Sequence, residues 1–216
     1  MTDNSPIGFY DLSWLAVRGA SPQAIIDALE LSDPTSATWR QGINATAGDF
    51  WDFDARPDSF LSRVFITPEV GGWRLAVGGW LGGVNRDQPG SDVAEYCRRL
   101  SREFGETHAF TTQGRMDWYG WCLARNGVVC RHFLWADRLL LDEGFSTPAE
   151  EEARKAGSDG RVSRFPSEKV VMAIAGECSI NPIHLESMRS AGAGCLAVTA
   201  WGRRHGVPTR SLDEES

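Results

Sequence analysis

The sequence lacks long apolar runs and contains very little lysine. No apolar stretch approaches the 18 or so residues that a membrane-spanning helix requires, so we expect no membrane association. Residues 1–6 carry neither a basic region nor an apolar core, so we expect no secretory signal and a cytoplasmic location. Of the 22 basic residues only Lys155 and Lys169 are lysines, and 29 acidic residues give a net charge of −7. This acidic balance disfavours nucleic acid as a partner.

The common motifs of catalysis and cofactor binding are also missing. The sequence contains no phosphate-binding loop, no dinucleotide-binding glycine motif between a strand and a helix, and no G-x-S-x-G. The five cysteines form no C-x-x-C and their irregular spacing favours reduced thiols, while the four histidines form no H-x-x-x-H pair. The acidic segment that begins at Asp49 fails as a calcium loop, because Arg56 and Pro57 occupy positions that need an oxygen ligand and a glycine. We therefore assign no catalytic residue, no cofactor and no metal.

What is present is the composition of an ordinary globular protein with many tryptophans. The 216 residues are 42% hydrophobic and 24% charged, and nine of them are tryptophan. A chain of this length can bury a core without disulfides or metals. We expect one domain over residues 1–216, with a sheet and two helices in 12–145 and a helical extension in 146–205.

The first half of the chain contains clear capping and turn patterns. A strand is expected at 14–18 and a helix at about 22–31, with Ser21 as the N-cap and proline at the first helical position. The Gly71-Gly72 dipeptide predicts a hairpin between residues 64–70 and 73–79, which pairs Val70 with Trp73 and Ile66 with Val77. The alternation in these strands predicts one buried and one solvated face, with an ion pair between Glu69 and Arg74.

The second half begins with the strongest helical pattern in the chain. Five apolar residues share one stripe of a helix over residues 92–104: Val93, Tyr96, Cys97, Leu100 and Phe104. Asn126-Gly127 predicts a hairpin that places Trp118 opposite Trp135 and Cys122 opposite Arg131. Thr147 and Glu150 form a capping box, and further helices are expected from Ser167 to Cys178, after Asn181 and over 191–201. The order of these elements predicts an α+β fold. Its antiparallel sheet is built from two β-α-β-β-like units, with both helices on one face and additional C-terminal helices.

Three segments together resemble a known group of proteins. They are residues 14–19 with the short helix that follows, residues 64–78, and residues 171–182. They resemble an uncharacterised family of cytoplasmic proteins from GC-rich bacteria, over about residues 12–186. The resemblance implies a shared fold and no particular activity. By analogy with other small bacterial proteins of this kind, it suggests an immunity protein that neutralises a toxin.

Two acidic segments are candidates for binding a protein partner with a basic surface. The first mixes acidic and aromatic residues and the second follows the 126–127 hairpin; the candidate residues are Asp49, Trp51, Asp52, Phe53, Asp54, Asp142 and Glu143. Acidic fields accelerate the encounter with a basic partner, and aromatic side chains supply the desolvated anchors that charge alone cannot provide. The leading hypothesis is therefore a non-enzymatic binding protein.

Two other functions stay open. The first is a small-ligand-binding protein or enzyme with a pocket beside the 118–135 hairpin, formed by Trp121, Arg131 and His132. Cys130 and His132 would share a strand face there, but apolar neighbours favour a structural pair over a reactive thiolate. The second is a structural subunit of a larger assembly.

Overall fold

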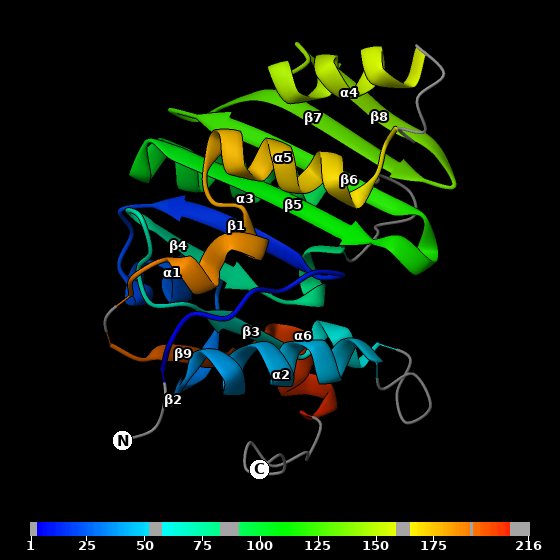
Figure 1. Cartoon of the computed structure of the whole chain (residues 1–216). Helices are drawn as coiled ribbons and strands as arrows, with labels where there is room; N and C mark the ends of the chain where they lie inside the picture. The colour runs from blue at the N-terminus through cyan, green and yellow to red at the C-terminus, as the bar shows by residue number, and fades with distance from the viewer. Residues whose placement is uncertain (1–3, 52–57, 83–90, 159–164, 191, 208–216) are drawn as a thin grey trace.

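A single nine-stranded antiparallel sheet forms the centre of the protein (Figure 1). The computed structural model describes residues 4–51, 58–82, 91–158, 165–190 and 192–207. The strands lie in the order β2-β9-β3-β4-β1-β5-β6-β7-β8. Their bounds are β1 Ser13–Arg18, β2 Ser32–Ala37, β3 Arg63–Ile66, β4 Trp73–Val77, β5 Glu106–Gln113, β6 Trp118–Arg125, β7 Val128–Ala136, β8 Arg138–Gly144 and β9 Gly194–Val198. The expected α+β class is thus confirmed.

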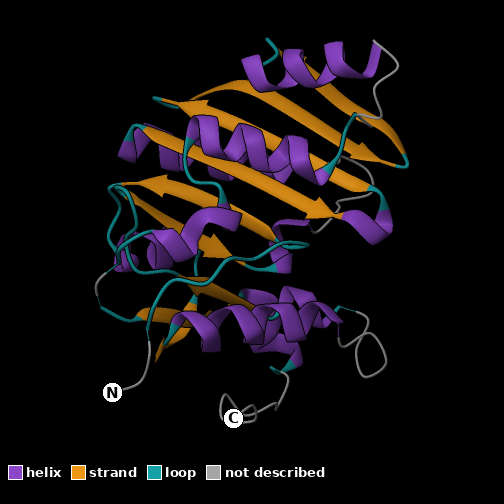
Figure 2. Ribbon diagram, viewed as in Figure 1, coloured by secondary structure: helices purple, strands orange, loops and turns teal. Residues whose placement is uncertain are grey.

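Helices cover both faces of this sheet (Figure 2). Their bounds are α1 Pro22–Ala28, α2 Trp39–Trp51, α3 Ser91–Phe104, α4 Pro148–Ser158, α5 Glu168–Cys178 and α6 Ala200–His205, with 3-10 helices η1 Ser59–Leu61, η2 Gly79–Gly82, η3 Gly114–Met116 and η4 Pro182–Ser187. The two helices expected in the first part of the chain, α1 and α3, share one apolar core with one face of the sheet. On the other face, α2 and α5 enclose a second core around Trp14, Phe65 and Trp121.

Local chemistry explains where α1 and α3 form. The Ser21 hydroxyl accepts a hydrogen bond from the backbone N–H of Ala24, so the predicted N-cap of α1 is confirmed. In α3, Cys97 and Leu100 are fully buried, while the other three residues of the predicted stripe are only partly buried. The helix therefore contacts the sheet through the centre of the stripe, and its margins border on solvent.

The first hairpin follows its prediction at the turn and departs from it further along. Val70 pairs with Trp73, as expected. The expected ion pair is also present, with Oε2 of Glu69 3.8 Å from Nη2 of Arg74. Beyond Pro68 the register shifts by one residue, so that Ile66 faces Ala76 instead of Val77. Proline has no N–H to donate to a ladder, and a bulge here resolves that defect. The expected solvated face is wrong, because β3 lies inside the sheet between β4 and β9 and is buried on both faces.

The second hairpin also contains a one-residue shift. Its first pairs, Arg125 with Val128 and Ala124 with Val129, are as predicted. Beyond them, Leu123 faces Arg131, and Trp118 faces Ala136, so the predicted register is wrong from this point. Cys130 is the additional residue of a bulge, which reverses the face of every later side chain in β7.

The C-terminal segment completes the sheet. Residues 194–198 form β9 between β2 and β3, so the helix expected over 191–201 is wrong for this part, and the helical α6 begins only at Ala200. Gly194 lies against Phe65, and a Cβ atom at position 194 would be 2.4 Å from Cε2 of that ring. The small residue therefore lets β9 approach β3, and a contact between residues this far apart in sequence has no local signature.

The core contains one unusual polar group, His108 in β5. The side chain is buried with its ring centroid 5.4 Å from that of Trp73, and neither ring nitrogen has a hydrogen-bond partner among the described residues. Burial lowers the pKa of His108 from 6.5 to about 4, although the charge of Glu106 acts in the opposite direction. The imidazole is therefore neutral in the folded protein at pH 7.

We expect acidification to destabilise the protein through His108. Since the pKa of the folded state lies below that of the unfolded state, the unfolded chain binds the proton first as the pH falls below about 6.5. Lowering the pH from 7 to 5 should reduce the free energy of unfolding by about 2 kcal/mol through this residue. Urea denaturation of His108→Leu should show a shallower pH dependence than the native protein, while exposed His184→Gln should not. Equal slopes for all three proteins would contradict this.

Candidate functional site

The structure reassigns the first acidic segment. Asp49 lies in α2 and is buried, with its carboxylate oxygens 2.5 and 2.8 Å from Nη2 and Nε of Arg63 in β3. The expectation that Asp49 faces a partner is therefore wrong, because this ion pair fastens α2 to the sheet. Asp52, Phe53 and Asp54 lie outside the described residues, as does the side chain of Trp51.

The second acidic segment lies on β8, at one edge of the sheet. Oδ1 of Asp142 is 2.7 Å from Nη1 of Arg131, and Oδ2 of Asp142 is 3.5 Å from Nη2 of Arg154 on α4. The side chain of Glu143 is exposed, and its backbone carbonyl accepts a hydrogen bond from Arg131. Asp142 is thus partly committed to internal ion pairs, and Glu143 is the more available of the two.

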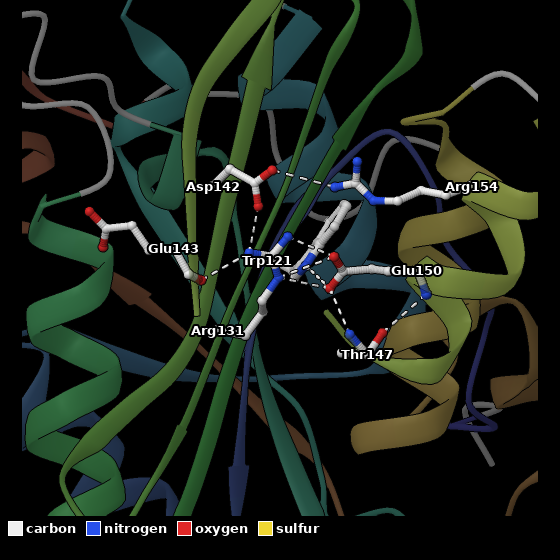
Figure 3. Close-up of polar contacts among 7 residues, drawn as sticks. All are labelled: Trp121, Arg131, Asp142, Glu143, Thr147, Glu150 and Arg154. Carbon is white, nitrogen blue, oxygen red and sulfur yellow. Dashed lines mark hydrogen bonds and ion pairs between the residues drawn. The ribbon is translucent and has the colours of Figure 1, made fainter. Parts of the chain in front are cut away.

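Arg131 is the centre of a buried polar network between β7 and α4 (Figure 3). Its Nη2 donates to Oε2 of Glu150 at 2.7 Å, and its Nε donates to Oε1 at 3.0 Å. Trp121 Nε1 donates to the same carboxylate at 2.8 Å. Both members of the ion pair are buried. Their charges compensate each other, and the Trp121 N–H further stabilises the carboxylate.

The predicted capping box holds Glu150 in this position. The N–H of Glu150 donates to the Thr147 hydroxyl at 3.2 Å, and the N–H of Thr147 donates back to Oε1 of Glu150 at 3.3 Å. The first turn of α4 therefore holds the Glu150 carboxylate in the position where it contacts Arg131. The network is saturated with internal contacts, which is typical of a structural junction.

The expected pocket beside the second hairpin is present in part. A hollow of about 350 Å³ lies there, and both Arg131 and His132 line it, together with Arg98, Cys130 and Glu143 among others. His132 pairs with Cys122 on the face opposite Trp121, because of the Cys130 bulge. The expectation that Trp121 belongs to this pocket is therefore wrong. Burial lowers the pKa of His132, which the charge of Glu143 opposes.

A second hollow lies on the α1 and α3 face and combines aromatic with acidic side chains. It measures about 370 Å³ and is bounded by the end of α1, η2, α3 and α6. We name it the aromatic pocket; its lining includes Trp80, Tyr96, Trp201, Glu30, Asp92, Glu95 and Arg99. The rings of Trp80 and Tyr96 meet edge to face, with centroids 5.3 Å apart. This arrangement offers aromatic surface inside a ring of charged groups.

Among the described residues, the lining of the aromatic pocket contains more acidic than basic side chains. It has three carboxylates, of which Glu95 is paired with Arg98, and one cation, Arg99. The Arg99 guanidinium lies 5.7 Å from the Tyr96 ring centroid and donates to the carbonyl of Ala28. Burial and then the charge of Asp92 raise the pKa of Tyr96, while the charge of Arg99 acts in the opposite direction. The described carboxylates and the aromatic rings together favour a cation as the occupant.

Only the α3 part of this pocket has a local pattern in the sequence. Asp92, Glu95, Tyr96 and Arg99 follow the spacing of one helical face. Tyr96 also belongs to the predicted core stripe, and it packs against that core at the margin of the helix. Trp80 and Trp201 are too far apart in the sequence for any local pattern to bring them together.

Comparison of the chain with family models, with curated proteins and with solved structures finds no match. Within the described ranges, no group of three or more histidine, cysteine, aspartate or glutamate residues is placed to hold a metal ion. No helix of the same ranges is both long and apolar enough to cross a membrane. The pockets and the surface are therefore the features of the described residues that bear on function.

The Arg131 network yields a stability prediction. Glu150→Gln keeps the shape of the side chain and leaves Arg131 buried without its main counter-charge. We expect a loss of about 3–5 kcal/mol in the free energy of unfolding, because a half-broken buried ion pair costs more than the pair contributed. Glu151→Gln on the exposed side of the same helical turn should change it by less than about 0.5 kcal/mol. Urea denaturation measures both, and equal stabilities would show that the network is not required.

Proposed function

We propose that this protein is a non-enzymatic binding protein whose partner is a protein with a basic surface. The observation that carries the proposal is the aromatic pocket, which would receive a cationic side chain of that partner. Trp80, Tyr96 and Trp201 line it, and tryptophan is the best of the aromatic residues for a cation–π contact. Its volume of about 370 Å³ lies in the lower part of the range of ligand pockets.

The net charge supports the same partner class. At −7, the chain attracts a basic protein over long range and accelerates their encounter. The carboxylates around the pocket then select the cation, and the aromatic rings slow its departure once water is displaced. Charge and aromatic surface thus act on different steps of binding.

An immunity protein that neutralises a toxin is the specific form of this proposal. Proteins that act on nucleic acids carry basic surfaces, because they must neutralise phosphates. An acidic binding protein that occupies such a surface would prevent access of the nucleic acid. A bacterial toxin of this class is therefore the partner that the charge of the pocket favours.

A second candidate function rests on the hollow beside the second hairpin. Arg98, His132 and Glu143 place both charge signs around about 350 Å³, which suits a small polar molecule. In that case a small ligand would be retained in native mass spectrometry, and His132→Ala would release it.

The pocket can be tested without knowledge of the partner. The probe is N-acetyl-arginine methylamide, compared with the neutral norleucine analogue and followed by tryptophan fluorescence. We expect only the arginine probe to bind, and Trp201→Ala to weaken it by roughly 3- to 30-fold through loss of the cation–π contact. Trp201→Phe is the matched control, because it retains an aromatic face.

Capture of the partner from the source cells tests the protein-level proposal. The native chain and the Trp201→Phe variant should retain the same basic protein, and Trp201→Ala should release it faster. Glu30→Gln should slow association at low salt and have little effect at high salt, since salt screens exposed charges. Equal binding by all variants, with folding intact, would remove the pocket from the interface.

A further inference from the structure

Strand β8 is an unprotected edge of the sheet. It has a neighbour, β7, on one side only, so the backbone groups on its other side have no strand partner in the described sheet. The opposite edge, β2, contains Pro34, which hinders the addition of a strand. Both edge strands contain a register shift, but β8 has three consecutive leucines and no proline. A strand of this kind is a template for pairing with another chain.

The pairing of β8 with β7 fixes the faces of its charged residues. Cys122 lies on the α3 face, and Trp118 shares that face because it is an even number of residues away in β6. Trp118 pairs with Ala136, and Ala136 pairs with Arg138, so Arg138 lies on the α3 face as well. Glu143 pairs with His132, which lies opposite Cys122 on the same face. The shift in β8 makes Leu140 the additional residue between them. Arg138 and Glu143 therefore lie on one face, at opposite ends of the strand.

We propose that β8 pairs antiparallel with β8 of a second copy of this chain. The register that brings residues of the same face together places Arg138 of each copy opposite Glu143 of the other. The two-fold symmetry forms this ion pair twice, and Leu140 of each copy lies opposite Leu141 of the other. In parallel pairing Arg138 would lie near Arg138 and Glu143 near Glu143, so the charges select the antiparallel dimer.

Two apolar residues near the ends of β8 are also exposed. Leu139 near the beginning of β8 is 50% exposed, and Phe145 directly after its end is 94% exposed. The two-fold arrangement brings the Phe145 end of each strand to the Leu139 end of the other. Leu139 pairs with Trp135 and therefore lies on the face that Asp142 and α4 share, opposite the face of Arg138 and Glu143. Apolar surface that is exposed in one copy is thus available for burial in the dimer.

This dimer is compatible with the proposed function and independent of it. In Figure 1, β8 lies at one end of the molecule, while α6, which borders the aromatic pocket, lies at the other. Pairing through β8 therefore leaves both aromatic pockets open, and a dimer displays two of them. A failure of pocket binding would leave the dimer prediction unchanged, and the reverse also holds.

Charge reversal provides the test. The molar mass of the full-length protein is measured by light scattering and sedimentation between about 1 and 100 μM. We expect a dimer in the native chain and at least tenfold weaker dimerisation in Arg138→Glu and in Glu143→Arg. The double variant, Arg138→Glu with Glu143→Arg, should recover the dimer, because the exchanged charges face each other again. Arg40→Glu on α2 is the control for the same charge change at an exposed site away from β8.

Each outcome decides the proposal. Weakening in both single variants with restoration in the double variant supports the antiparallel register, because the two single variants change the net charge in opposite directions. A native chain that is monomeric at 100 μM overturns the proposal, and so does a dimer that both single variants leave intact. Circular dichroism and thermal denaturation confirm that each variant folds, so that loss of the dimer is not loss of the structure.

Discussion

One additional residue in β7, Cys130, determines the polar arrangement of this half of the protein. Side chains alternate between the faces of a strand, so a bulge exchanges the face of every residue beyond it. Because of this exchange, Arg131 lies under α4 beside Trp121 and meets Glu150, while His132 lies on the α3 face. Without the bulge, Arg131 would lie on the α3 face against the apolar core, and His132 would lie beside the carboxylate of Glu150. The ion pair that fastens α4 to the sheet therefore depends on it.

The parts of the fold that local rules govern were predictable from the sequence. The cap at Ser21, the capping box at Thr147 and Glu150, and the two hairpin turns each depend on residues within a few positions of one another. The bulges were not predictable, because they are settled by the packing of both faces. Strand β9 was missed for a similar reason, since it forms only where β2 and β3 leave a gap between them.

The candidate site was predicted less well than the fold. The sequence places Asp49 in an acidic segment expected to bind a partner, but in the structure it is a buried partner of Arg63. A run of acidic residues does not reveal whether one of them pairs with a buried cation, because that cation lies on another element, as Arg63 of β3 does for Asp49 of α2. The aromatic pocket shows the converse difficulty. Its charged residues share one face of α3, whereas its tryptophans come from η2 and α6 and meet only in the folded chain.

Helix α3 connects the two hollows of its face through its own charges. Its core stripe anchors it through Cys97 and Leu100, while Arg98 lines the hairpin hollow and Glu95 lines the aromatic pocket. These two side chains form an ion pair at 2.5 Å across one helical turn. Both side chains are largely exposed, so the pair contributes little to stability and is screened by salt. The buried centre of the stripe therefore fixes the position of α3, and the charged residues at its margins are left to shape the surface of both hollows.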